Sequence, residues 1–269
     1  AIKAITFTGS TRVGEHIARV ATPMFKKVSL ELGGKNPNII FFFFYYDKLL
    51  STTARSSFAN QGQICLCGSR IFVEESIYER FRDDFVKKIK QLKIGDPNDK
   101  DTKIGALVSR PHLEKVASYV ELAKEEGGTI LCGGKKPEIT GRCADGLFFE
   151  PTVIEGLSHD CRTNQEEIFG PVVTIMPFKD EAEVLMMANS TQYGLSCTLW
   201  TENLSRAQRM SQHIQAGIVW VNCWMLRDLR TPFGGVKQSG VGREGGFEAM
   251  RFFTESKNVC IAFNHDLEI

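Results

Sequence analysis

One stretch organises this chain, Phe58-Ala59-Asn60-Gln61-Gly62-Gln63-Ile64-Cys65-Leu66-Cys67-Gly68-Ser69-Arg70. A thiol is a useful nucleophile as thiolate, and backbone N–H groups in an uncrowded Gly/Ser turn can hold a cysteine partly in that form. We therefore expect Cys65 to be a nucleophile, with Cys67 as the competing thiol. The alternative is that Cys65 is an inert, buried small hydrophobe, which is how cysteine usually behaves.

A carboxylate upstream of this stretch is the candidate base. Glu31 lies in the block Val28-Ser29-Leu30-Glu31-Leu32-Gly33-Gly34-Lys35-Asn36-Pro37, inside an apolar run that ends abruptly in Gly-Gly. Partial desolvation raises the pKa of a carboxylate toward the range where it can accept a proton and return it. The alternative is a buried carboxylate that is paired with Lys or Arg.

Length and composition indicate a folded globular chain with a sizeable core. The 269 residues are 42% hydrophobic and 24% charged, which is ordinary for such a chain. The formal net charge is +1 and both signs are interspersed, so neither nucleic acid nor an anionic membrane is an expected partner. The longest apolar run, from Ile39 to Tyr46, is far too short to span a bilayer. The expected partners are small molecules and other subunits.

The cysteines indicate the redox environment of the protein, and the first residues indicate whether the sequence is a fragment. Eight cysteines are scattered without the C-x-x-C spacing of a zinc site or redox dithiol, so we expect no metal and reduced thiols in a cytoplasmic protein. The chain opens on Ala1-Ile2-Lys3-Ala4, without an initiator Met, and leads at once into a strand. This opening predicts a fragment or a truncated gene product.

Strands and helices alternate along the chain, which predicts an α/β fold with a largely parallel sheet. The expected strands cover residues 4–8, 28–32, 37–44, 71–73 and 218–222. The expected helices cover residues 15–21, 76–92, about 109–127, a segment after the Asp180/Glu183 capping box, and 204–214. His112, on the third helix, is expected at the surface.

Two further segments carry expectations of their own. Residues 41–46 are all aromatic, and because side chains alternate across a strand, some of them must be exposed, fill an interface or reflect a sequence error. The segment 258–263 reads as an edge strand with nothing in the sequence to pair with.

A glycine-bearing turn follows the first strand, Gly9-Ser10-Thr11-Arg12-Val13-Gly14. A helix that starts here would present backbone N–H groups and a positive dipole end to a phosphate. The spacing lacks the Lys of a P-loop, so a simple tight turn is the alternative.

The blocks around Glu31 and Cys65 together resemble the aldehyde dehydrogenase family. The Leu-Glu-Leu-Gly-Gly-Lys-Asn-Pro and Asn-Gln-Gly-Gln-x-Cys motifs occur in that family's order and separation, and the blocks Glu166–Pro171 and Pro232–Gly240 agree. The resemblance implies an aldehyde dehydrogenase-like α/β catalytic domain over 33–243. It also implies a remnant of a Rossmann-like cofactor domain over 1–32, preceded by about as many residues again, and a C-terminal segment over 244–269 with an oligomerisation strand.

The resemblance also implies roles for single residues. Cys65 would attack an aldehyde, its backbone N–H would stabilise the oxyanion, and Glu31 would activate the water that hydrolyses the resulting thioester. The cofactor, NAD with NADP not excluded, would contact Gly9, Ser10, Gly14, Glu167 and Phe169. Glu244 would be a second carboxylate near the water path. A dimer or tetramer is the implied assembly.

A loop near the C-terminus bears on the substrate. The pattern Trp224-Met225-Leu226-Arg227-Asp228-Leu229 is similar to the subgroup that oxidises 2-aminomuconate or 2-hydroxymuconate semialdehyde. A guanidinium can bind a carboxylate through two parallel hydrogen bonds, so we expect Arg227 to anchor an aldehyde that carries an acid. Pairing of Arg227 with Asp228 is the alternative. A broad-range aldehyde dehydrogenase and a truncated, non-catalytic chain remain the alternative functions.

Overall fold

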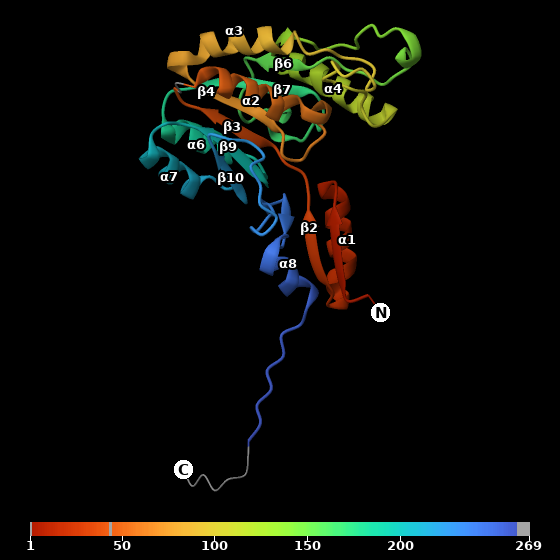
Figure 1. Ribbon diagram of the computed structural model, residues 1–269, viewed down its shortest axis with the longest axis vertical. Helices are drawn as coiled ribbons and strands as arrows, with labels where there is room; N and C mark the ends of the chain where they lie inside the picture. The colour runs from red at the N-terminus through yellow and green to blue at the C-terminus, as the bar shows by residue number, and fades with distance from the viewer. Residues whose placement is uncertain (1, 43–44, 263–269) are drawn as a thin grey trace.

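A seven-stranded sheet is the centre of the larger part of the molecule in this computed structural model, which describes residues 2–42 and 45–262 (Figure 1). In spatial order its strands are β10 (Ile218–Val221), β9 (Ser196–Trp200), β3 (Asn36–Ile40), β4 (Gly68–Glu74), β7 (Val172–Phe178), β6 (Thr152–Glu155) and β5 (Thr129–Cys132). Every neighbouring pair is parallel except β5 with β6. The predicted α/β fold with a largely parallel sheet is confirmed.

Helices cover both faces of this sheet. The helices α2 (Tyr46–Phe58) and α3 (Tyr78–Ile89) pack on one face, where Phe58, Phe81 and Phe85 meet strand residues such as Ile71. The helices α4 (Arg110–Glu125), α6 (Glu181–Asn189) and α7 (Leu204–His213) pack on the other face. Neither these helices nor any other in the described segments combines the length and apolarity of a bilayer span.

A smaller layer stands below the main sheet (Figure 1). It consists of β1 (Ala4–Thr8), β2 (Lys27–Glu31) and β12 (Gly240–Val241), with α1 (Thr11–Ala21) and α8 (Gly246–Phe253) beside them. The remaining short elements are η1 (Thr22–Met24), η2 (Ala59–Gly62), η3 (Glu75–Ile77), η4 (Gly141–Cys143), α5 (Arg162–Gln165) and the pair β8 (Tyr193–Gly194) with β11 (Val236–Lys237). Residues 32–35 join β2 to β3, so the junction between the two layers lies next to Glu31.

The predicted elements appear with shifted ends. Helix α1 begins at Thr11 rather than at residue 15, because the Ser10 side chain accepts a hydrogen bond from Val13 N and caps the helix. The helix predicted over 76–92 is η3 followed by α3, which ends at Ile89.

The strand predicted over 37–44 ends at Ile40. Within the aromatic run, Phe41 is buried, Phe42 is exposed and Tyr46 begins α2, while Phe43 and Phe44 lie outside the described residues. Of the three alternatives, exposure in the single chain is what the structure shows for Phe42 and Tyr45.

The strand predicted over 258–263 does not form in the single chain. Residues 255–262 run away from the body of the molecule and belong to no helix or strand (Figure 1), while Phe263 lies outside the described residues. A strand is stabilised by hydrogen bonds to a neighbouring strand, and no strand among the described residues pairs with this segment.

Candidate active site

The Cys65 loop turns back sharply after α2. Asn60, Gln61 and Gly62 all have positive φ, at 49°, 56° and 70°, and Cys67 N donates to Ile64 O at 2.9 Å to close the following turn. A side chain at position 62 would be both strained and blocked, since its Cβ would lie 2.1 Å from Gly170 O. The loop therefore depends on glycine here.

Amide side chains hold this loop from two directions. Gln61 accepts from Gly105 N and donates to Ala106 O, each at 3.1 Å. On the other side, Asn36 Nδ2 donates to the carbonyl oxygens of Cys65 and Cys67 at 2.7 and 2.9 Å.

Asn36 is a site residue that sequence reasoning missed. It is 3% exposed, and its Oδ1 accepts from Ser196 N at 3.0 Å, so its whole amide group is used in the interior. The two amides Asn36 and Asn38 in a short segment next to Ile39 and Ile40 are the signal that could have identified it, because a buried polar group needs partners.

The Gly33-Gly34 turn lies in close contact with two other segments, the one that carries Glu167 and the Cys65 loop. Gly34 N donates to Glu167 Oε1 at 2.9 Å, and a Cβ at Gly33 would lie 2.6 Å from Glu167 Oε2. A Cβ at Gly34 would lie 2.9 Å from Cys65 O. Any larger residue at either position would push the Cys65 loop and Glu167 apart.

A cavity of about 510 Å³ lies where these segments meet. Its wall includes Gly9 and Ser10 from the start of α1, together with Cys65, Glu167 and Phe169. Five of the residues predicted to be catalytic or to face a cofactor thus border one space. Gly14 lies elsewhere, buried in α1 with Leu32 so close that a Cβ would be 2.4 Å from Leu32 Cδ2.

His112 and Lys115 of α4 also line the cavity. His112 Nε2 is 2.6 Å from Phe169 O, and the two rings are in edge contact with centroids 6.0 Å apart. Phe169 has a φ of 60°, which is uncommon for an aromatic residue, so this contact helps to fix its ring in the wall. The expectation that His112 is a surface residue is wrong, because α4 turns it inward. Lys115 Nζ donates to Glu167 O at 2.8 Å.

Glu31 is 5% exposed, and its pKa is raised to about 7. Burial is the largest cause, the carboxylate of Glu244 adds to it, and the charges of Arg243 and Arg227 oppose it. The predicted rise in pKa is therefore confirmed. The alternative of a paired carboxylate is not what the described residues show, since none of their ion pairs includes Glu31.

The Cys65 thiol is not held as a thiolate in this structure. The pKa of Cys65 is raised to about 11. Burial is the largest cause, and the carboxylates of Glu31 and Glu167 add to it. A hydrogen bond from the Cys65 backbone and the charge of Arg227 lower the pKa by less. The expectation of a partly ionised thiol is thus wrong at this point, and the reaction needs a base. Cys67 is more deeply buried, its pKa is raised to about 12, and its Sγ lies 3.8 Å from Ala59 O.

Arg227 does not pair with Asp228. Asp228 instead accepts from Arg230, with 2.9 Å between Arg230 Nε and Asp228 Oδ1. The Arg227 guanidinium carbon lies 3.9 Å from the ring centroid of Phe233, and its charge lowers the pKa values of both Glu31 and Cys65. Glu244 bonds Phe233 through the backbone in both directions, which places this carboxylate next to Glu31.

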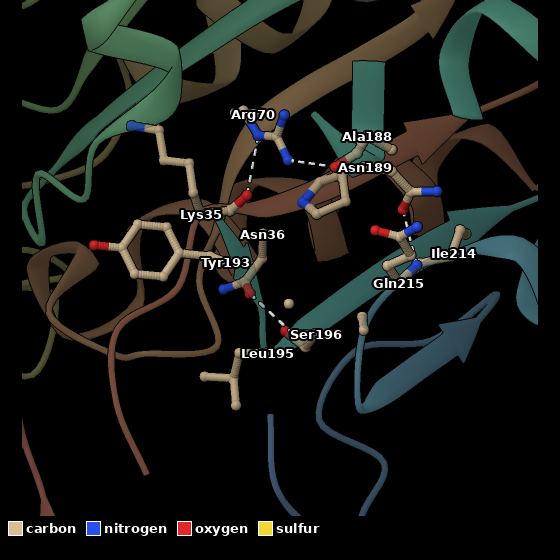
Figure 2. A pocket seen from close by; sticks show the side chains of 13 residues that line it. Lys35, Asn36, Arg70, Ala188, Asn189, Tyr193, Leu195, Ser196, Ile214 and Gln215 are labelled. Carbon is tan, nitrogen blue, oxygen red and sulfur yellow. Dashed lines mark hydrogen bonds between the residues drawn. The ribbon is translucent and has the colours of Figure 1, made fainter. Parts of the chain in front are cut away.

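A polar recess is lined by Lys35 and Asn36 at the start of β3, by Arg70 and by residues of the segment around β8 (Figure 2). Arg70 is fully buried there without a carboxylate, and it donates to the carbonyl oxygens of Lys35, Met187 and Ala188 at 2.8–3.0 Å. Burial lowers its pKa to about 9. The recess holds only about 10 Å³, so we regard it as a brace for the segment that carries Asn36.

Comparison with known proteins places this geometry in context. Residues 1–259 match the sequence model of the aldehyde dehydrogenase family. A 2-aminomuconic 6-semialdehyde dehydrogenase from Pseudomonas sp is 49% identical over 265 residues, covering 98% of this chain and 54% of the relative. A 2-hydroxymuconic semialdehyde dehydrogenase from Pseudomonas putida is 48% identical and is covered to the same 54%.

Solved structures of aldehyde dehydrogenases are also similar to this chain. Apo betaine aldehyde dehydrogenase from Staphylococcus aureus, as a G234S mutant, superposes with a TM-score of 0.91 at 40% identity, over 95% of this chain and 51% of that one. The same enzyme in complex with NAD+ superposes with a TM-score of 0.89, over 92% of this chain and 49% of that one. The chain thus spans about half the length of the relatives it matches.

Proposed function

This chain belongs to the aldehyde dehydrogenase family, and from that premise we propose that its protein oxidises an aldehyde to a carboxylic acid, with NAD as oxidant and NADP as the alternative. The observation that carries this proposal is the placement of Cys65 on the wall of the 510 Å³ cavity, within range of the charge of Glu31. A nucleophile and a base with a pKa of about 7 then serve one reacting carbon.

In the first step, Cys65 attacks the aldehyde. Its thiol is protonated at neutral pH, so Glu31 takes the proton as Sγ adds to the aldehyde carbon. The backbone N–H of Cys65 stabilises the oxyanion that forms. When bound, the nicotinamide cofactor supplies the hydride acceptor for this adduct. An acyl group then remains on Sγ as a thioester.

The second step belongs to Glu31. After releasing its first proton to the solvent, Glu31 takes a proton from a water molecule that attacks the thioester. The C–S bond then breaks, the carboxylic acid is released, and the proton passes from Glu31 to the Cys65 thiolate. A thioester is easier to hydrolyse than an aldehyde hydrate is to oxidise, so covalent catalysis divides one difficult step into two. Glu244, whose charge raises the pKa of Glu31, is proposed to lie on the path of this proton.

The residues of the cavity fit the nicotinamide end of the cofactor. The start of α1 brings Gly9 and Ser10 to the wall, and the first N–H groups of a helix have no partner within it, so they suit a phosphate. The Glu167 carboxylate suits a ribose hydroxyl, and the Phe169 ring suits a flat apolar partner. Gly14 would act indirectly, by letting α1 pack on Leu32.

The substrate we propose is a muconic semialdehyde, either 2-aminomuconate or 2-hydroxymuconate semialdehyde. Support comes from the relatives at 48–49% identity and from Arg227, whose guanidinium carbon lies over the Phe233 ring, 3.9 Å from its centroid. A guanidinium can bind a carboxylate through two parallel hydrogen bonds. Oxidation of a broad range of aldehydes is the alternative, and substrate profiling separates the two.

The remaining proposals concern the whole protein. We divide this sequence into the end of a cofactor domain over 1–32, a catalytic domain over 33–243 and a C-terminal segment over 244–269. We also propose a homo-oligomer, dimer or tetramer, in the cytoplasm. Supporting the oligomer are the exposed apolar side chains of Phe247, Met250 and Phe253 on α8.

The test is turnover of the full-length protein that contains this sequence. Cys65→Ala should abolish NADH formation from a muconic semialdehyde, while Cys67→Ala, the matched thiol control, should keep it. Glu31→Gln should remove even the first burst of NADH near neutral pH, because no base is left to take the proton from the Cys65 thiol. Retained turnover in Cys65→Ala would reject the proposal, and an inactive wild type with normal cofactor binding would favour a non-catalytic chain.

A further inference from the structure

Two arginines near the Cys65 loop lack the partner that surface arginines usually have. Arg230 shows the usual case, since Asp228 accepts from its Nε and neutralises it. Arg55 and Arg227 are exposed, like Arg230, yet across residues 2–42 and 45–262 neither guanidinium has a hydrogen bond or an ion pair. Each lies instead over an aromatic ring.

Arg55 is in the last turn of α2, just before the loop that carries Cys65. Its guanidinium carbon lies 5.4 Å from the centroid of the Trp224 ring. A ring face attracts the flat guanidinium and fixes its plane, while its N–H groups point outward from the edge. In that orientation Arg55 is prepared to bind a carboxylate.

Trp224 connects Arg55 to the nucleophile. Its ring is 6% exposed, and its Nε1 donates to Leu66 O at 3.0 Å, next to Cys65. Trp224 belongs to one apolar cluster with Leu66, against which Ile64 and Cys65 pack. Arg55 is therefore held at the rim of the apolar wall that includes the nucleophile.

Arg227 reaches the same wall from a different element. Its ring partner Phe233 packs on the cluster of Trp224, and the Arg227 charge acts on the Cys65 thiol. One guanidinium thus comes from a helix and the other from the loop that follows β10. The rings under the two guanidinium groups belong to one apolar cluster that also includes Cys65, and such a cluster suits a hydrocarbon chain.

We propose that Arg55 is a second specificity-determining residue, which binds the carboxylate of the aldehyde substrate alongside Arg227. This inference rests on the function proposed above and adds a second residue that would recognise the acid group of the proposed substrate. Trp224 orients Arg55, the apolar wall receives the chain, and the carboxylate meets the free N–H groups.

The test compares two aldehydes of equal length in the full-length protein, one ending in a carboxylate and the other in the corresponding amide. For Arg55→Gln we expect the KM for the acid to rise on the order of tenfold, since a charge-assisted hydrogen bond is lost. The KM for the amide and both kcat values should stay unchanged. Arg55→Lys should fall between, because it keeps the charge and loses the flat fork.

Arg230→Gln is the matched control, as it removes an exposed guanidinium that Asp228 already neutralises, and it should leave both KM values unchanged. An equal rise in both KM values for Arg55→Gln, or a fall in both kcat values, would mean that Arg55 only supports Trp224, and would overturn the inference. A wild type that oxidises neither aldehyde would overturn the proposed function itself, and the role of Arg55 with it.

Discussion

Glu31 couples the chemistry of the site to the stability of the fold. Its pKa in the folded chain is about 7, above its ordinary 4.5, so the native state favours the protonated form. The associated stability is complete below about pH 4.5, and it is lost as the pH rises through 7. Glu31→Gln should therefore leave the free energy of unfolding unchanged at pH 4 and raise it by about 1–3 kcal/mol at pH 8.

Urea unfolding at the two pH values measures this effect. Glu15→Gln, which changes an exposed carboxylate on α1, serves as the control and should alter stability little at either pH. A gain of the same size for Glu31→Gln at pH 4 and pH 8 would show that burial does not perturb this carboxylate.

Asn36 can be tested against its neighbour on β3, Asn38. Asn36→Ala leaves the buried carbonyls of Cys65 and Cys67 without their donor, so we expect a loss of about 2–3 kcal/mol and faster alkylation of Cys65 as its loop loosens. Asn38 is as buried, but it bonds Thr53 and Ser56 of α2 at 3.4–3.5 Å. Asn38→Ala should destabilise the chain without changing the reactivity of Cys65. Equal alkylation rates in the two variants would remove the role given to Asn36.

The turn at Gly62 joins two elements, and another glycine of positive φ provides its control. Gly62 and Gly127 have φ of 70° and 91°, but a Cβ at Gly62 would meet Gly170 O at 2.1 Å, whereas nothing lies within 4 Å of one at Gly127. Both Ala variants suffer the strain of positive φ, about 1 kcal/mol. Gly62→Ala must also displace backbone, so it should lose about 2 kcal/mol more in urea unfolding. An equal loss of unfolding free energy in the two variants would show that the Cys65 loop shifts to accommodate the added Cβ without further cost.

Sequence patterns predicted the helices that have one buried face and one solvent-exposed polar face. The apolar stripe of Phe81, Phe85 and Ile89 corresponds to α3 and the capping box at Asp180 to α6, because a half-exposed helix alternates polar and apolar residues in a readable way. The strands β5, β6, β7 and β9 were not predicted. In β7 nearly every residue is buried, so a largely apolar run replaces the alternation that marks a half-exposed strand. In β9 every residue is buried, the polar Ser196 and Thr198 included, so polarity along the sequence does not indicate which side chains face the interior.

At the scale of the molecule, sequence blocks identified the residues that meet at the cavity but not their state. Cys65, Glu167 and Gly9 lie far apart in the chain and border one space, as the family resemblance implied. The pKa of Cys65 could not be read from its Gly/Ser surroundings, because it depends on burial and on two carboxylates from distant segments. The inward position of His112 likewise depends on how α4 packs, which local sequence does not determine.

The C-terminal tail makes the proposed oligomer testable. Val259 and Ile261 are 67% and 69% exposed on a segment that leaves the body of the chain (Figure 1), and exposed apolar residues of this kind mark contact surfaces. If the tail pairs with another subunit, Val259→Asp with Ile261→Asp should shift the full-length protein to a smaller species in sedimentation velocity, since charge is costly to bury. Lys257→Ala, on the same segment, is the control and should keep the wild-type mass. An unchanged mass for the double variant would place the subunit contact elsewhere, with the α8 side chains as the next surface to change.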